Sequence, residues 1–488
     1  MRDQAQAPFM KTKIIATLGP ATANRERLVE MFDVGLDVCR LNFSHGDLDG
    51  HQRTLELVRA VAAERDEPIC VIGDLCGPKI RLGRFDGGPV EVQAGDVIRI
   101  VRGTGDCSAE RLTTTFPGLI DEVAPEHRIL INDGLVRLTV RERRADELIC
   151  ECRTGGALNT RMGVNLPDTP ISLPALTEKD RRDLEWAIAH DLEYVALSFV
   201  RQPDDLYELK RLIKQADSPL QVIVKIEKTE ALWHLDELIA HTDGVLVARG
   251  DLGVETDVWR VPVIQKDIVA ECQHAGVPVI VATQMLQSMI DNPMPTRAEV
   301  SDVANAILDR TDAVMLSGET AVGRYPTKAV EMMHNVAIAT EEFLAKRPPT
   351  EPPDYISTHY RPTAAIAHAA VAAARDLGAR LVAVWSATGA TVRLVARHRL
   401  PMPVVGLTYD ARVARQMNLL YGVTPIRVEP LDNPAAMAAA LDAELLKRQL
   451  ALNGDIVVVV TSTRPTTPGA TDTALVRRVG QPEAGQPI

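Results

Sequence analysis

The stretch 222–255, VIVKIEKTEALWHLDELIAHTDGVLVARGDLGVE, decides the fold that we expect for this chain. It contains two short apolar runs, at 222–224 and 244–247. Between them, ALWHLDELIAH has apolar residues at the spacing of one helical face. The pattern therefore predicts a strand, a helix and a second strand. Charged side chains follow both apolar runs at once, and these are Lys225, Glu227, Arg249 and Asp251.

Charged strand ends of this kind indicate an active face. In a parallel α/β barrel, the carboxyl ends of the strands all meet at one face, where catalytic residues gather. Glu227 and Asp251 on neighbouring strands could hold one hard divalent cation, and Lys225 beside them could meet an anionic substrate. A solvated strand end followed by an ordinary turn would explain either segment alone. That explanation accounts less well for two such segments that lie one helix apart in a repeating pattern.

The composition narrows the class of protein. A chain of 488 residues exceeds the usual size of one domain. Its net charge of −12 argues against a general nucleic-acid or anionic-membrane surface. The seven cysteines are scattered and lack zinc spacing, which favours reduced thiols in a cytoplasmic protein. We find neither an apolar signal core nor a run long enough to span a bilayer, so we expect no membrane partner.

Strand and helix patterns alternate over most of the first 345 residues. Eight strands separated by helices predict a (β/α)₈ TIM barrel, an α/β fold. The eight expected strand regions are 12–19, 37–44, 69–75, 194–200, 222–227, 244–251, 277–285 and 313–320.

The alternation of strand and helix patterns is interrupted twice along the chain. Glycines, prolines and short alternating runs over 77–164 predict an all-β domain inserted after the third strand. A proline-rich stretch at 346–362 predicts a linker, and a smaller α/β domain follows at 363–480. The remaining expected parts are a leader at 1–10, the barrel at 11–76 and 165–345, and a tail at 481–488.

Ten segments occur in an order that resembles the pyruvate kinase family across 11–480. They are IIATLGPAT, RLNFSHG, GDLCGPKIR, GVNLP, LSFV, VKIE, VARGDLGVE, ATQMLQSMI, PTRAEVSDVANAILD and MLSGETAVGRYP. The resemblance implies phosphoryl transfer from phosphoenolpyruvate to ADP, giving pyruvate and ATP, the last step of glycolysis. It also implies that the inserted domain is a lid, that the C-terminal domain is regulatory, and that the chain forms a homotetramer.

The same resemblance implies roles for residues of the expected active face. Glu227 and Asp251 would ligate Mg²⁺ or Mn²⁺, and Lys225 would act on the transferring phosphoryl group and the nascent enolate. Arg40 would bind phosphate and take part in catalysis. Thr283 would direct a proton to the enolate through water, although a plain β-branched strand residue is the competing interpretation.

Further positions match binding motifs of the family. The short GDL segment at 250–252, which begins with Gly250, would open a small helix, and its free N–H groups would hold the substrate carboxylate. Arg81, which also matches a phosphate-contacting arginine, and Asn42 would bind the nucleotide, although Arg40 and Arg81 could instead be ordinary surface pairs. The family's monovalent-cation site would consist of Asn42, Ser44 and Asp74, and Asn165 and Ser198 would line the cavity.

Some positions depart from the commoner family pattern. Lys79 stands where many members have Glu, and its ammonium would replace the monovalent cation, so we expect no K⁺ requirement. Met162 stands where a nucleotide-contacting Lys is usual, with Arg161 beside it. In the C-terminal domain, WSATGATVR (385–393) keeps hydroxyl groups but lacks the basic residues of sugar-phosphate-activated members. A phosphorylated effector, a different ligand or none are all compatible with this loop.

Two other functions fit part of the pattern. Another Mg²⁺-dependent, enolate-forming barrel enzyme could use the same acids, but it would not explain the inserted domain. A non-catalytic sensor of phosphoenolpyruvate could keep the fold, but the intact Lys225, Glu227, Asp251 and Thr283 argue against lost chemistry.

Overall fold

A computed structural model describes residues 9–103, 105–347, 361–431, 433–463, 469 and 471–481. Eight parallel strands close into a barrel in the order β1-β16-β15-β14-β13-β12-β3-β2. This confirms the predicted (β/α)₈ barrel. The strands are β1 (Lys13–Thr17), β2 (Val38–Asn42), β3 (Cys70–Asp74), β12 (Tyr194–Leu197), β13 (Gln221–Ile226), β14 (Gly244–Ala248), β15 (Val279–Ala282) and β16 (Ala313–Leu316).

The strands close a barrel because their apolar side chains pack on both faces. Ile15, Ile223 and Ile280 belong to the core inside the barrel, whereas Ile14 and Val224 belong to the core under the helices. Such two-sided burial is typical of parallel sheets covered by helices. The covering helices are α1 (Arg25–Asp33), α2 (Leu48–Arg65), α4 (Glu178–Ala189), α5 (Pro203–Gln215), α9 (Val261–Ala275), α10 (Arg297–Leu308) and α12 (Pro326–Ala345).

The stretch 222–255 forms the expected unit with one correction. The single helix predicted between its strands is two helices, α6 (Thr229–Trp233) and α7 (Leu235–His241). They part at His234, whose φ of −118° and ψ of 19° lie outside the α region. The short helix expected after β14 is α8 (Arg249–Glu255). At the start of α4, Thr177 and Asp180 form a complete capping box.

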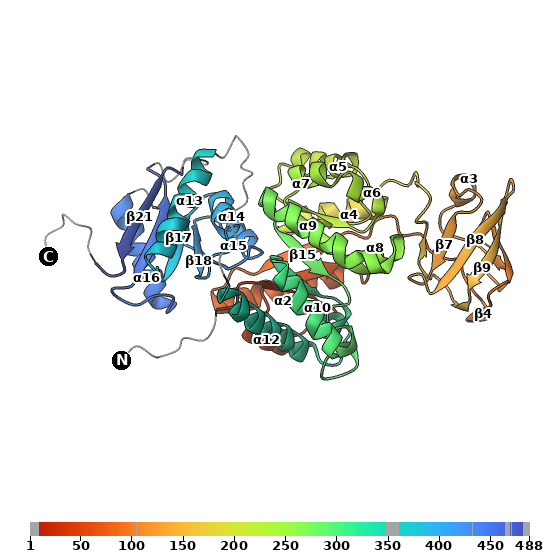
Figure 1. The fold of residues 1–488 in the computed structure, drawn as a ribbon, viewed down its shortest axis with the longest axis horizontal. Coiled ribbons are helices and arrows are strands. Elements are labelled where there is room, and N and C mark those ends of the chain that lie inside the picture. Colours follow the sequence, from red (N-terminus) through yellow and green to blue (C-terminus); the bar gives the residue numbers. More distant parts are fainter. Residues whose placement is uncertain are drawn as a thin grey trace.

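The inserted domain has a core of its own, which includes Ile98, Leu138 and Cys150. Figure 1 shows it at one end of the molecule, projecting away from the barrel. Its larger sheet runs β11-β7-β8-β9-β5-β6, and β10 pairs with β4. Its elements are β4 (Val90–Val92), β5 (Val97–Val101), β6 (Arg111–Leu112), α3 (Leu119–Glu122), β7 (Arg128–Ile131), β8 (Val136–Arg143), β9 (Glu147–Thr154), β10 (Gly156–Leu158) and β11 (Val164–Asn165).

The C-terminal domain is a five-stranded sheet in the order β19-β18-β17-β20-β21, with helices packed on it. It lies at the opposite end of the molecule from the inserted domain (Figure 1). Its elements are α13 (Arg361–Asp376), β17 (Leu381–Trp385), α14 (Ala390–Ala396), β18 (Val404–Thr408), α15 (Ala411–Met417), β19 (Val423–Arg427), α16 (Pro434–Lys447), β20 (Ile456–Thr461) and β21 (Thr473–Arg478).

The C-terminal domain closes the amino-terminal end of the barrel. Leu419 joins the core inside the barrel, and Asn418 donates a hydrogen bond to the Asp37 carbonyl at 2.8 Å. Arg399 pairs with Asp312 at 2.9 Å, and Arg415 with Glu193 at 2.5 Å. These contacts make the seam between the two domains an ordered interface.

The remaining expectations concern the terminal segments and the linker, the cysteines, and membrane spans. Most of the expected leader, linker and tail lies outside the described residues. Within the described part of the chain, all seven cysteines are free, and no helix is long and apolar enough to cross a membrane.

Candidate active site

Three strands, β2, β3 and β13, bring charged residues together at the carboxyl end of the barrel. Asp74, 1% exposed, accepts from Arg40 Nε at 2.7 Å through Oδ2 and from Lys225 Nζ at 3.2 Å through Oδ1. Lys225 Nζ also donates to Ser198 Oγ at 2.8 Å and lies 2.8 Å from Glu227 Oε1. Four of the predicted site residues, Arg40, Asp74, Lys225 and Glu227, therefore form one buried network.

The pKa values in this network follow from burial and charge. Burial raises the pKa of the Asp74 carboxyl, but the charges of Arg40 and Lys225 outweigh it, and the net shift is downward. Burial lowers the pKa of Lys225, but Asp74 and Glu227 raise it above its ordinary value. Lys225 is therefore an ammonium at neutral pH, so it can stabilise negative charge but cannot act as a base.

Glu227 and Asp251 fit the predicted divalent-metal site. Burial raises the pKa of Glu227, Lys225 opposes the shift, and the nearby Asp251 carboxylate adds to it. A divalent cation between these acids would relieve the cost of burying the Glu227 charge, and carboxylate oxygens suit Mg²⁺. The described residues gather no group of three or more His, Cys, Asp or Glu that could hold a metal. A two-carboxylate site leaves the other coordination positions to substrate and water.

Lys79 reaches the active face from the start of the inserted domain. Its ammonium lies 3.6 Å from Asp251 Oδ1, and both side chains are about one-quarter exposed. Among the described residues, no ion pair joins Lys79 to Asp74. The lysine therefore contacts the expected divalent-metal carboxylate instead of the expected monovalent-cation carboxylate.

Thr283 and Gly250 are joined directly. The Gly250 N–H donates to Thr283 Oγ1 at 2.8 Å, and that hydroxyl donates to the Ala282 carbonyl at 2.6 Å. Thr283 has a φ of 69° and Gln284 a φ of 55°, a left-handed conformation that is unfavourable for a β-branched residue. Backbone strain of this kind concentrates at functional sites. The first N–H group expected to hold the substrate carboxylate is thus occupied by Thr283.

Of two other predicted binding residues, Asn42 lies beside this network and Arg81 lies apart from it. Asn42 is the register partner of Asp74, and its Oδ1 accepts from the Ser44 N–H at 3.1 Å. Arg81 bridges to Gly163 and donates to the Arg161 carbonyl at 3.1 Å, which ties it to the inserted domain. The structure brings Asn42 beside the buried network, whereas the described contacts of Arg81 are within the inserted domain.

Several supporting residues were missed by sequence reasoning. Thr17 accepts from Arg40 Nη1 at 2.8 Å, and Arg249 donates to the Thr283 carbonyl at 2.8 Å. Glu255, which is only 4% exposed, accepts from Lys228 Nζ and Asn165 Nδ2, both at 2.7 Å. Thr17 and Glu255 lie within motifs that carried the family resemblance. Their side-chain partners are distant in sequence, so spacing alone could not assign them.

Two family models and several relatives match most of this chain. Residues 9–330 match the family model described as pyruvate kinase, barrel domain, and residues 364–477 match that of the pyruvate kinase alpha/beta domain. A pyruvate kinase of Mycobacterium intracellulare is 40% identical over 475 residues, covering 96% of this chain and 98% of that protein. Pyruvate kinase 2 of Synechocystis sp. is 40% identical over 466 residues, covering 95% of this chain and 78% of that protein.

A solved structure extends the likeness to three dimensions. The crystal structure of a pyruvate kinase from Cryptosporidium parvum superposes with a TM-score of 0.88 at 32% identity, covering 96% of each chain. The family models, the relatives and this structure span the barrel, the inserted domain and the C-terminal domain. The chain belongs to the pyruvate kinase family.

Proposed function

We propose that the network around Lys225 carries out the family reaction, phosphoryl transfer from phosphoenolpyruvate to ADP. One observation carries the proposal: the Lys225 ammonium lies between Asp74 and Glu227. The Asp251 carboxylate, which can share a metal with Glu227, lies nearby. Phosphoryl transfer needs positioned positive charge more than covalent chemistry by the protein. A fixed ammonium whose pKa is raised meets that need.

The residues divide the work between binding and charge stabilisation. Arg40, held by Asp74 and Thr17, presents a fixed guanidinium that suits phosphate oxygens. Lys225 stabilises the charge that spreads over the phosphoryl oxygens as the bond to the enolate oxygen breaks. Thr283 holds the Gly250 N–H and could orient a water that protonates the enolate carbon. Held by Glu227 and Asp251, Mg²⁺ or Mn²⁺ would supply positive charge to the substrate oxygens.

We infer that K⁺ is not required. Three acids (Asp74, Glu227 and Asp251) and three cationic side chains (Arg40, Lys225 and Lys79) meet at this face, so their formal charges sum to zero. Glu at position 79 would change that sum to −2 and favour an added monovalent cation. Lys79 supplies that positive charge from within the chain.

Apolar surface supports the proposed homotetramer. Trp233, Val258, Trp259 and Val263 are all at least 60% exposed. Val258, Trp259 and Val263 follow one another along the turn before α9 and its first residues. Exposed apolar groups that cluster in this way are typical of a surface covered by another subunit. Sedimentation of the wild type and of Trp259→Glu tests this, because a smaller species is expected only for the variant.

A phosphorylated effector at the C-terminal domain remains a prediction. The described residues around the outer pocket beside Trp385, Ser386 and Ala387 include Glu429 and no Lys or Arg. Thr391 donates or accepts a 2.8 Å hydrogen bond with Thr471, so its hydroxyl already has a partner. These contacts favour a ligand other than a sugar bisphosphate in that pocket.

An assay of ATP formation tests the proposed function. Phosphoenolpyruvate and ADP are supplied with Mg²⁺, and both ATP and pyruvate are measured. Equal amounts of the two products support phosphoryl transfer. Pyruvate without ATP would instead indicate another enolate-forming enzyme, and saturable binding without turnover would indicate a sensor.

A further inference from the structure

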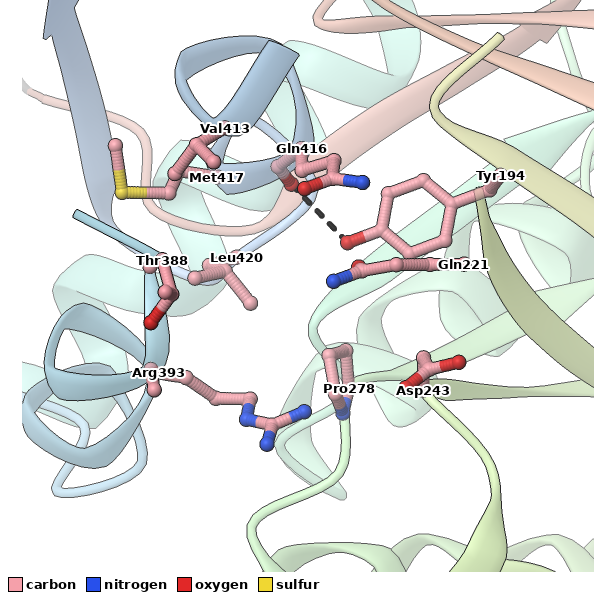
Figure 2. A pocket seen from close by; sticks show the side chains of 12 residues that line it. Tyr194, Gln221, Asp243, Pro278, Thr388, Arg393, Val413, Gln416, Met417 and Leu420 are labelled. Carbon is pink, nitrogen blue, oxygen red and sulfur yellow. Dashed lines mark hydrogen bonds between the residues drawn. The ribbon is translucent and has the colours of Figure 1, made fainter. Parts of the chain in front are cut away.

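A pocket that is partly open to solvent lies between the barrel and the C-terminal domain, at the end of the barrel opposite the active face. The cavity has a volume of about 210 Å³. Figure 2 shows Gln221 and Tyr194 reaching into it from the barrel side and Arg393 and Thr388 from the C-terminal domain. Its lining comprises Tyr194, Gln221, Asp243, Pro278, Thr388, Gly389, Ala390, Arg393, Val413, Gln416, Met417 and Leu420.

The charged side chains that line this cavity leave one positive charge without a partner. The side chain of Arg393 makes no hydrogen bond or ion pair with any residue that the structure describes. The other charged group, Asp243, is already engaged: its Oδ2 accepts from the Val222 N–H at 2.9 Å and lies 3.3 Å from Lys210 Nζ. An unpaired guanidinium therefore faces a cavity whose acid is neutralised, and this arrangement favours an anion.

Neutral polar groups surround the guanidinium. The side chains of Gln221 and Thr388 also lack a hydrogen-bond partner among the described residues. Tyr194 donates its hydroxyl hydrogen to the Gln416 carbonyl at 3.2 Å, which leaves its oxygen free to accept. An amide and two hydroxyl oxygens can together donate to and accept from the hydroxyl groups of a ligand.

We propose that this cavity binds a small hydroxylated organic anion, with its carboxylate or phosphate on Arg393 and its hydroxyl groups towards Gln221 and Tyr194. The cavity is smaller than the roughly 300–1,000 Å³ of sites for drug-sized ligands, which limits the occupant to a few carbons. Glycerate and glycerol 3-phosphate have this size and chemistry.

The cavity is separate from the active face. Strand β13 begins with Gln221 at the cavity, and Lys225 stands near its other end. Four residue steps at about 3.3 Å each separate the two backbone positions by roughly 13 Å. A ligand in the cavity touches both domains and neither Lys225 nor Asp251, so variants can distinguish the two sites.

Isothermal titration calorimetry with glycerol 3-phosphate and with glycerate tests the proposal on the full chain. We expect saturable binding of at least one probe, weakened at least tenfold by Arg393→Gln. Arg427→Gln, at an exposed arginine of β19, and Asp251→Asn, at the active face, should leave the Kd unchanged. Binding of the phosphate probe alone identifies a phosphate site, and binding of both identifies a general anion site.

A second variant guards against a folding defect in Arg393→Gln. Ala390→Leu adds volume to the wall of the cavity without removing a charge, and it should also abolish binding. Thermal denaturation tests both variants for the native fold, and the probe should raise the Tm of the wild type only. An unchanged Kd in both variants, or no saturable binding of either probe, would overturn the proposal.

Discussion

The ammonium of Lys79 lies 3.6 Å from Asp251 Oδ1, although the two residues belong to different domains. Lys79 stands where the chain leaves the barrel for the inserted domain, and Asp251 lies in the first turn of α8. The contact brings a positive charge to the acid expected to hold the divalent metal. It therefore links the geometry of the inserted domain to the electrostatics of the active face.

Lys79→Glu should create a requirement for K⁺. The substitution changes the local charge by two units, and at about 5 Å and an effective dielectric of 20 each unit charge contributes roughly 3 kcal/mol. Turnover is measured in tetramethylammonium buffer with and without K⁺. The wild type should respond little and Lys79→Glu strongly, with Lys79→Met as the neutral control. Strong K⁺ stimulation of the wild type would refute the account of Lys79.

Asp251→Asn should lower turnover by at least about 100-fold, which corresponds to roughly 2.7 kcal/mol of transition-state stabilisation. The amide keeps the size of the side chain but removes the charge that attracts the metal. Titration with Mn²⁺ should show weaker metal binding in the same variant. Asp257→Asn, at an exposed acid nearby, is the matched control. Near-normal turnover in Asp251→Asn at ordinary Mg²⁺ concentration would contradict the assignment.

Lys225→Met should abolish ATP synthesis while retaining some metal-dependent exchange of the methyl protons of pyruvate. The ammonium is assigned to the phosphoryl group, whereas proton exchange depends on the enolate and on water near Thr283. Exchange is followed by proton NMR in deuterated buffer, with Lys214→Met at an exposed lysine as the control. Loss of exchange with survival of ATP synthesis would reverse the assigned role.

His398 should make stability depend on pH. Burial, helped by Arg397, His368 and Arg375, lowers the pKa of His398 to about 4. The unfolded chain binds this proton near pH 6.5 and the folded chain does not, so stability falls as pH drops from about 6.5 to 4. The two pKa values imply a loss of up to about 3 kcal/mol.

Urea unfolding at pH 7 and pH 5 measures this effect. His398→Gln should lose less free energy of unfolding between the two pH values than the wild type does. His234→Gln, at an exposed histidine, should behave like the wild type. Equal pH dependence in the wild type and His398→Gln would show that His398 titrates normally in the folded protein.

The sequence could predict the barrel because its signals are local. Each strand is a short apolar run, and the charges at the ends of β13 and β14 predict an active face there. The break at His234 was missed because the apolar residues keep their helical spacing on both sides of it. A backbone conformation at one residue leaves no trace in that spacing.

The partners of the site residues were harder to predict, because they depend on packing between distant segments. The Gly250–Thr283 hydrogen bond and the left-handed Thr283 backbone join two strand ends 33 residues apart. The direction in which the long Lys79 side chain points was equally hard to predict from the sequence. It could reach towards Asp74 or Asp251, and only the fold of the inserted domain selects Asp251.

The most direct test follows the phosphorus atom itself. Phosphoenolpyruvate, ADP and Mg²⁺ are mixed with the protein, and ³¹P NMR records every phosphorus species over time. The account predicts that the phosphoenolpyruvate signal is replaced one for one by the γ-phosphate of ATP, and that Asp251→Asn slows this at least about 100-fold. Release of inorganic phosphate in place of ATP, or an unchanged phosphoenolpyruvate signal with the wild type, would contradict it.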